Sequence, residues 1–373
     1  QTMIVVLFGT TNNRSLLFVC FFTTNQNSFI FFLHNSLLFS SCQNDSSANQ
    51  FNTIPMTSNT IQLAVAPMEG IMDHTMRQLL SEIGAMDYLV SEFVRITQYP
   101  MPAHTFKKLV PENQHQGKTA TGHPVHTQLL GSDPQIMAQS AINATLAGAT
   151  HIDVNFGCPA KRVNGHGGGS VLLQDTQALS KIISAIRSAL PDTITLSAKI
   201  RLGYQDEALL FANVEAIEKA GAQTLTVHGR TKKDGYSPPA RWEKIGLIRQ
   251  NSDMTIVANG DISNINSLSK CQEITQCSHF MIGRGALANP FVFQDIRQAL
   301  NGNIPTNHDH ELLPLFIRYA ELMQGYYDEV ATLGRLKQWC RNLREHFPVI
   351  EQNITSLRQS RHPDEFLQQL THF

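Results

Sequence analysis

The chain has 373 residues, which is enough for one large domain or two ordinary ones. A hydrophobic share of 42% and a charged share of 16% are typical of a globular protein with a sizeable core. The formal net charge is -1, so the chain as a whole does not attract polyanions. A nucleic-acid partner would therefore need a local basic patch.

The cysteines exclude two classes of small scaffold. None of the six forms a CxxC pair, and their spacing fits neither a zinc ribbon nor a zinc finger. They are also too scattered in too long a chain for a disulfide framework. We therefore expect reduced thiols, a cytoplasmic protein and no bound metal. The cysteines are Cys20, Cys42, Cys158, Cys271, Cys277 and Cys340.

Residues 1–55 differ in composition from the rest. Their only charged residues are Arg14 and Asp45, and their apolar runs at 15–22 and 29–39 are shorter or more interrupted than a membrane span requires. A signal peptide would need a basic start, which is missing. We expect residues 1–55 to be a non-native or disordered extension, with Met56 as the true start, and no membrane association.

From residue 60, short apolar runs alternate with amphipathic helical patterns such as 133–147, 177–190 and 207–220. Eight strands over about 240 residues predict a TIM (β/α)8 barrel at 56–300, although a doubly wound sheet gives a similar alternation. The predicted strands are 61–66, 88–91, 125–130, 151–154, 194–200, 224–228, 255–258 and 279–282.

After residue 293 the strand signals stop. A polar linker at 301–309 leads into helical patterns at 311–327 and 332–346, with a weaker one from Asp364. We expect a C-terminal helical-bundle domain at 308–373.

In a TIM barrel the active site lies at the C-terminal ends of the strands. The glycines at 260 and 283 lie after the predicted seventh and eighth strands, where such barrels commonly bind phosphate, and Arg284 adds positive charge. Ordinary turns are the alternative interpretation.

Cys158 lies in a Gly-Cys-Pro turn before a glycine-rich loop at 164–170. A cysteine on a mobile loop over a barrel mouth can donate a proton or act as a nucleophile. The alternative is a buried structural cysteine. Lys199, His228 and Gln128 also lie near strand ends, where they could hold a flavin or only the strands themselves.

Eight motifs, in order, resemble the tRNA-dihydrouridine synthases. The resemblance covers about 56 to 350, and the motifs Pro-Met-Glu-Gly and Ser-Glu-Phe-Val-Arg are similar to the bacterial C-type branch, which modifies uridine 16 of the D-loop. The motifs begin at Ala66, Ser91, Gln128, Asn155, Lys199, His228, Ala258 and Ile282.

The resemblance implies FMN as the hydride carrier, NADPH or NADH as the electron donor and Cys158 as the general acid at C5 of the uracil. It also implies that Asn155, Arg201 and Tyr236 hold a uridine flipped out of the tRNA. The residues implied to contact FMN are Pro67, Met68, Glu69, Gln128, Lys199, His228, Asn259, Gly260, Asp261, Gly283 and Arg284.

The helical domain is implied to bind tRNA. Lys337, Arg341 and Arg344 share one face of a predicted helix that also carries Arg335, and Arg95 is a further expected contact. A solvated charged face is the alternative. Trp339 and Leu343 lie on another face, where they can pack against the barrel.

Three other functions compete with this interpretation. They are an FMN barrel that reduces a free pyrimidine, as dihydroorotate and dihydropyrimidine dehydrogenases do, a tRNA-binding protein without catalysis, and a phosphate-binding isomerase. The basic helical domain argues against the first, the intact Cys158 and Lys199 against the second, and the absence of an obvious Glu/His base pair at the strand ends against the third. We expect a monomer.

Overall fold

The computed structural model describes residues 3–11, 14–22, 31–33, 36–38 and 61–371, in two units divided at Thr53 and Ile54. In the first unit, β1 (Met3–Thr11) and β2 (Arg14–Phe22) pair as an antiparallel hairpin, and β3 (Phe31–Leu33) pairs with β4 (Ser36–Leu38). Residues 39–60, including Met56, lie outside the described residues. The prediction of a non-native extension therefore remains a prediction.

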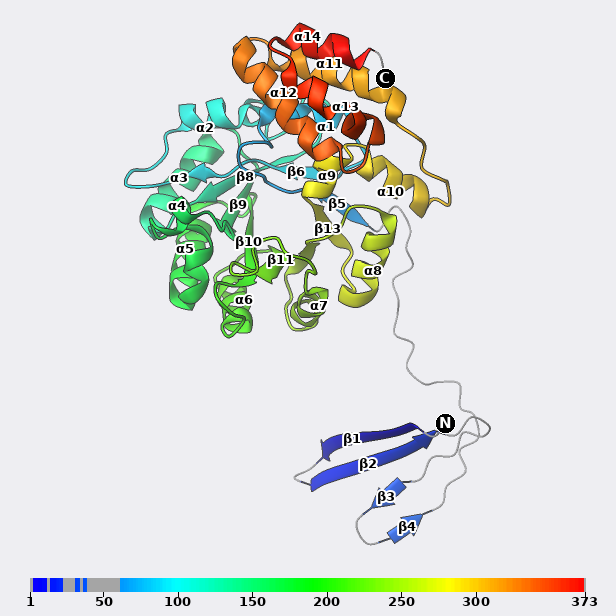
Figure 1. The fold of residues 1–373 in the computed structure, drawn as a ribbon. Helices are drawn as coiled ribbons and strands as arrows, with labels where there is room; N and C mark the ends of the chain where they lie inside the picture. Colours follow the sequence, from blue (N-terminus) through cyan, green and yellow to red (C-terminus); the bar gives the residue numbers. More distant parts are fainter. Residues whose placement is uncertain (1–2, 12–13, 23–30, 34–35, 39–60, 372–373) are drawn as a thin grey trace. The chain divides into compact units, whose positions relative to one another are not determined.

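The second unit contains a closed barrel of eight parallel strands (Figure 1). Pairing between β6 and β8 closes the ring, and the short β7 (Val94–Arg95) adds to β8. Closure excludes the doubly wound sheet and confirms the TIM barrel. The strands of the ring are β5 (Gln62–Val65), β6 (Tyr88–Val90), β8 (Val125–Leu130), β9 (His151–Phe156), β10 (Thr195–Gly203), β11 (Thr224–Thr231), β12 (Thr255–Asn259) and β13 (His279–Ile282).

The period of two along each strand separates the barrel interior from the helix layer. In β9, Ile152, Val154 and Phe156 are fully buried in the main apolar core, whereas the alternate positions carry polar side chains. The surrounding helices are α1 (His74–Ile83), α2 (Ala103–Leu109), α3 (Pro134–Leu146), α4 (Lys161–Asn164), α5 (Thr176–Ala189), α6 (Leu210–Lys219), α7 (Trp242–Gln250), α8 (Ile265–Thr275), α9 (Arg284–Ala288) and α10 (Val292–Leu300). Short 3-10 turns are η1 (Pro111–His115), η2 (Gly169–Gln174) and η3 (Asp309–Glu311).

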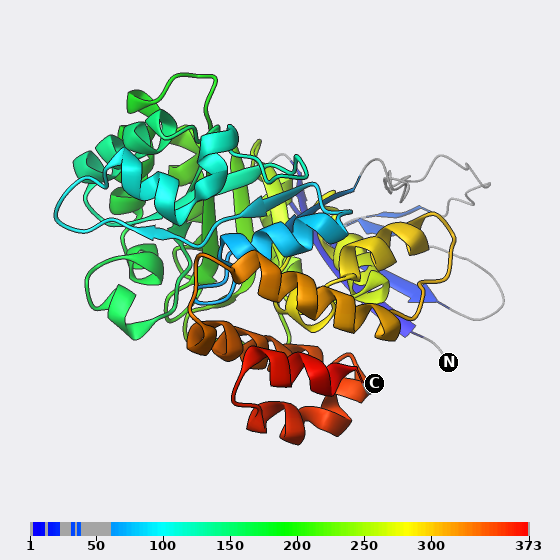
Figure 2. The same ribbon diagram turned by 90° about the horizontal axis from the view of Figure 1, so that it is seen from above.

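Four helices follow the barrel and pack beside it, as Figure 2 shows in orange to red: α11 (Leu312–Met323), α12 (Glu329–Leu343), α13 (Pro348–Gln359) and α14 (Pro363–Leu370). Trp339 organises their packing, because its ring lies 5.0 Å from that of Phe316 and 5.3 Å from that of Tyr319. Its indole N–H donates a 3.2 Å hydrogen bond to the carbonyl of Leu287 in α9. The predicted packing of Trp339 against the barrel is therefore confirmed.

Two further results concern the helices. The sequence analysis missed α13, which buries only Ile350 and Leu357 and so carries a weak periodic signal. Within the described part of the chain, no helix combines the length and the apolar character that crossing a membrane would require.

Candidate active site

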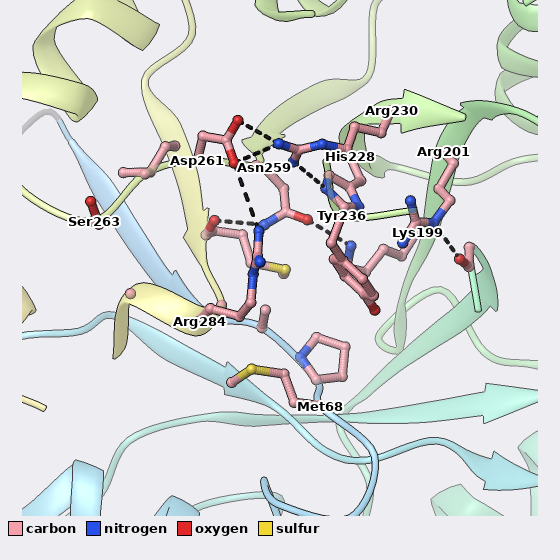
Figure 3. Close-up of a pocket in the computed structure, with 18 of the residues that line it drawn as sticks. Met68, Lys199, Arg201, His228, Arg230, Tyr236, Asn259, Asp261, Ser263 and Arg284 are labelled. Atoms are coloured by element: carbon pink, nitrogen blue, oxygen red, sulfur yellow. Dashed lines mark hydrogen bonds and ion pairs between the residues drawn. The ribbon is translucent and has the colours of Figure 1, made fainter. Parts of the chain in front are cut away.

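A cavity of about 440 Å³ opens where the strands end. This volume is within the range of about 300–1,000 Å³ typical of small-molecule and cofactor sites. Loops after β5, β9, β12 and β13 and residues of β10 and β11 form its wall (Figure 3). The lining residues predicted from the sequence are Pro67, Met68, Asn155, Lys199, Arg201, His228, Tyr236, Asn259, Gly260, Asp261, Gly283 and Arg284.

Lys199 presents a partly buried cation to this cavity. Its ammonium donates a 2.9 Å hydrogen bond to the Oδ1 of Asn259, whose own NH2 donates to the carbonyl of Met281 at 2.8 Å. Burial, together with the positive charge of Arg201, lowers the pKa of Lys199 to about 8. A negatively charged ligand group would therefore find a poorly solvated cation here.

Arg230, to which the sequence analysis gave no role, holds two predicted residues in place. Its guanidinium donates to both carboxylate oxygens of Asp261, at 2.7 and 2.6 Å, and lies 3.2 Å from the Nε2 of His228 (Figure 3). Burial and the surrounding cations, Lys199 first, hold the pKa of His228 far below its usual range. His228 is therefore a neutral hydrogen-bonding group.

The turn after β12 requires a glycine. Gly260 has a φ of +117°, and a Cβ there would lie 3.0 Å from the Cβ of Ala240 and 3.0 Å from the Cδ2 of His228. Its carbonyl accepts a 2.8 Å hydrogen bond from the indole of Trp242, which fixes the turn. The backbone can thus approach a bound group closely at this point.

Tyr236 lies between two arginines. The guanidinium carbons of Arg201 and Arg284 are each 5.1 Å from its ring centroid, and the side chain is 53% exposed. Arg201 is in turn held by the carbonyls of Gly157 and Gly235, at 2.9 and 2.8 Å. The arrangement places a partly exposed aromatic ring beside two cations at the cavity.

Cys158 lies beside the cavity, on the loop that follows β9. The thiol is half-buried, and burial raises its pKa, so the thiol stays protonated at neutral pH. The carbonyl of Cys158 accepts a 2.9 Å hydrogen bond from Asn164, and a Cβ at Gly169 would lie 2.8 Å from that carbonyl oxygen. The loop is therefore a packed turn in this structure.

Two predicted FMN contacts have other surroundings. Gln128 is fully buried, and its side-chain amide donates a hydrogen bond to Asp153 and accepts one from Asn155. Glu69 is exposed and does not line the cavity. Among the lining residues that the sequence analysis did not single out, Asn342 and Glu345 come from the end of α12 and the turn after it, so the helical part completes the cavity wall.

The cations assigned to tRNA divide into two groups. Arg335 pairs with Asp73 of the barrel at 2.9 Å, and Lys337 donates to the carbonyl of Ser360, so both take part in packing. Arg344 is exposed and pairs with Glu351 at 3.2 Å.

Arg341 is exposed and makes no hydrogen bond or ion pair with the described residues. Arg95 is partly buried, and its only hydrogen bond within them is a 3.5 Å contact with the carbonyl of Arg162. Within the described ranges, no three His, Cys, Asp or Glu side chains are grouped so as to hold a metal ion.

Comparison with known proteins identifies the family of the chain. The profile described as Dihydrouridine synthase (Dus) matches residues 64–371. The chain is 38% identical to the tRNA-dihydrouridine(16) synthase of Shewanella oneidensis, over 83% of this chain and 97% of that one. It is 40% identical to the enzyme of the same name from Neisseria meningitidis serogroup A, over 82% and 92%. The chain therefore belongs to the dihydrouridine synthase family, the flavin-dependent enzymes that reduce uridine in tRNA.

Proposed function

We propose that this protein reduces uridine 16 in the D-loop of tRNA to 5,6-dihydrouridine, with FMN as cofactor and NADPH or NADH as electron donor. The position is supported by relatives named tRNA-dihydrouridine(16) synthase that match nearly their whole length. The observation that carries the proposal is a cation-lined cavity at the barrel mouth with a protonated thiol beside it.

The cavity residues suit FMN. The backbone at Gly260 and Gly283, with Arg284 and the neutral His228, would hold the phosphate. Lys199 would face the pyrimidine side of the ring, where negative charge develops on reduction. Pro67 and Met68 would contact the ring from the loop after β5. The contacts implied for Glu69 and Gln128 remain predictions.

The mechanism divides between cofactor and protein. The flavin, when bound, supplies the hydride for C6 of the uracil. Cys158 supplies the proton for C5, and its raised pKa keeps that proton in place until it is needed. Arg201 and Tyr236 would hold the flipped base, and Asn155 would orient it beside the thiol.

The tRNA would dock across the barrel mouth and the helical domain. A uridine inside the folded tRNA is unreachable, so it must be flipped out. The loss of stacking costs a few kcal/mol, which contacts of the base with Tyr236 and the flavin ring can partly offset. Exposed Arg341 and Arg344 and partly buried Arg95 would contact phosphates. We propose that the protein is cytoplasmic, because its substrate is tRNA, and that it acts as a monomer.

The direct test uses purified protein with its own flavin and a tRNA transcript without dihydrouridine. The proposal requires a flavin absorption spectrum and formation of dihydrouridine with NADPH, and loss of product but not of flavin in Cys158→Ala. Flavin with reduction of free pyrimidines alone would support a pyrimidine reductase. Absence of flavin would contradict the site, and an unimpaired Cys158→Ala would contradict the role of the thiol.

A further inference from the structure

A chain of buried polar side chains crosses the interior of the barrel below the active site. Gln128 of β8 and Ser197 of β10 are both register partners of Asp153 in β9, so the three lie in one row across adjacent strands. Asn155 lies two residues further along β9, nearer the catalytic end. All four side chains are at most 7% exposed.

In this row, the donor and acceptor of each hydrogen bond are determined by the bond before it. Asp153 accepts from the Nε2 of Gln128 at 2.7 Å and from the hydroxyl of Ser197. Both oxygens of Asp153 accept, so the NH2 end of the Gln128 amide is the end that faces it. The Oε1 of Gln128 is then left to accept from the Nδ2 of Asn155 at 2.8 Å.

Asn155 connects Gln128 to the loop that carries Cys158. With its NH2 committed to Gln128, its Oδ1 accepts from the backbone N–H groups of Gly157 and Cys158, at 2.9 and 2.8 Å. These two bonds hold the backbone that carries the thiol. Without the preceding amide, Asn155 could rotate its amide group and lose both.

Beyond Ser197, this row of polar side chains ends in two neutral imidazole rings. The Nε2 of His151 lies 2.9 Å from the hydroxyl of Ser197, and its ring stacks on that of His126 at 3.4 Å. Burial lowers the pKa of His151 to about 3 and that of His126 well below its usual range. Burial raises the pKa of Asp153, while the hydrogen bonds from Ser197 and Gln128 and the charge of Lys199 oppose that rise. Both of its oxygens accept in this structure, and the orientation of the two amides follows from that.

We infer that Asp153, acting through Gln128 and Asn155, is a positioning residue for Cys158 in the reduction of uridine. The inference rests on the proposed role of the Cys158 thiol as proton donor. Asp153 itself does not line the active-site cavity. A proton donor must be held within hydrogen-bond reach of its target, and misplacement by about 1 Å can cost on the order of 100-fold in rate.

Three variants test the hydrogen bonds that lead from Asp153 through Gln128 to Asn155, which we call the relay. Asp153→Leu keeps a similar shape but removes the acceptor, and Gln128→Met removes the relay amide. Asp153→Asn removes the charge yet can keep the relay, because its oxygen can still accept from Gln128 while its NH2 donates to Ser197. Ser197→Ala is the matched control, since it deletes the other bond to Asp153 and leaves Gln128 and Asn155 in place.

The first readout does not depend on activity. The rate at which iodoacetamide alkylates Cys158, followed by peptide mass spectrometry with Cys158→Ala as the blank, reports the geometry of the loop. We expect Asp153→Leu and Gln128→Met to change this rate several-fold. Asp153→Asn and Ser197→Ala should stay within about two-fold of wild type, because in both variants Gln128 still accepts from Asn155. The double variant Asp153→Leu/Gln128→Met should change the rate no more than either single variant does.

The second readout is turnover with saturating tRNA. We expect kcat to fall by about 10- to 100-fold in the two relay-breaking variants with KM for tRNA unchanged, and with flavin content unchanged in Asp153→Leu. Normal alkylation in both would overturn the inference and leave the proposed function intact. Equal loss of kcat in Asp153→Asn would also overturn it, because the charge rather than the orientation would then matter. Full activity of Cys158→Ala would instead contradict the proposed function.

Discussion

Lys199 and Asn259 meet across the barrel mouth, the ammonium of one donating a 2.9 Å hydrogen bond to the side-chain oxygen of the other. The two residues come from β10 and β12, which are separated by β11. Burial has lowered the pKa of this lysine to about 8, so the protein keeps a costly cation at the point where the proposed flavin would carry negative charge.

Replacement of Lys199 by Met should weaken FMN binding by about 10-fold or more, the effect of one charge-assisted hydrogen bond. The free energy of unfolding of the flavin-free protein should not fall, because the variant no longer buries an ammonium. FMN titration and urea unfolding measure the two effects. Unchanged FMN affinity would contradict the assignment of Lys199.

The pH dependence of the same residue has a definite sign. The folded-state pKa of about 8 lies below the ordinary value of 10.5. The unfolded chain therefore binds more protons between these values, and the cost of burying Lys199 is full below pH 8 and is relieved as pH rises through that window. FMN affinity of the wild type should fall above about pH 8 as the cation is lost, and Lys199→Met should lack this fall.

Gly260→Ala should destabilise the protein by about 1–3 kcal/mol, because the left-handed backbone and the close approach to Ala240 and His228 both oppose a Cβ. Gly302→Ala is the matched control, as that glycine has a φ of +81° with open space around it. The free energies of unfolding of both variants, measured in urea, separate the cost of backbone strain from the cost of steric contact by the added Cβ. Equal losses would show that the contacts at Gly260 are unimportant.

Arg335→Met should be strongly destabilising, on the order of 2–4 kcal/mol, because it leaves Asp73 as a buried carboxylate without its cation. The side chains of this pair are 18% and 7% exposed, whereas those of Arg344 and Glu351 are 46% and 52% exposed. Arg344→Met should therefore cost under about 1 kcal/mol. Thermal unfolding of both variants makes the comparison, and similar losses would refute the assignment of Arg335 to packing.

Arg341→Gln should weaken tRNA binding with little change in stability, since this side chain is exposed and unpaired among the described residues. Loss of one phosphate contact should lower the slope of log affinity against log salt by about 0.7–0.9. Filter binding at several salt concentrations measures this slope. Binding and slope equal to wild type would place the tRNA elsewhere.

Much of the fold could be predicted from the sequence. Each barrel strand is a short stretch rich in apolar residues and bounded by turn residues, so its position is a local property. This holds even in β9, where polar and apolar residues alternate. Most of the cavity wall could also be predicted, because those residues directly follow strands of a barrel.

The rest depended on contacts that no local pattern encodes. The ion pair of Arg335 with Asp73 joins segments far apart in the chain, so a residue that resembled part of an RNA-binding stripe serves in packing. Asn342 and Glu345 reach the cavity only because α12 docks against α9. The hydrogen bonds from Asp153 through Gln128 and Asn155 to Cys158 depend on the register of β8 against β9.

The central claim is that this protein reduces one defined uridine of tRNA. The most direct measurement maps dihydrouridine by mass spectrometry of tRNA fragments after incubation of an unmodified tRNA with the wild-type protein and NADPH, and with Cys158→Ala in parallel. The account predicts dihydrouridine at position 16 alone, and its loss in the variant. Modification at a different position would contradict the assignment of the site, and absence of dihydrouridine from the wild-type reaction would contradict the function itself.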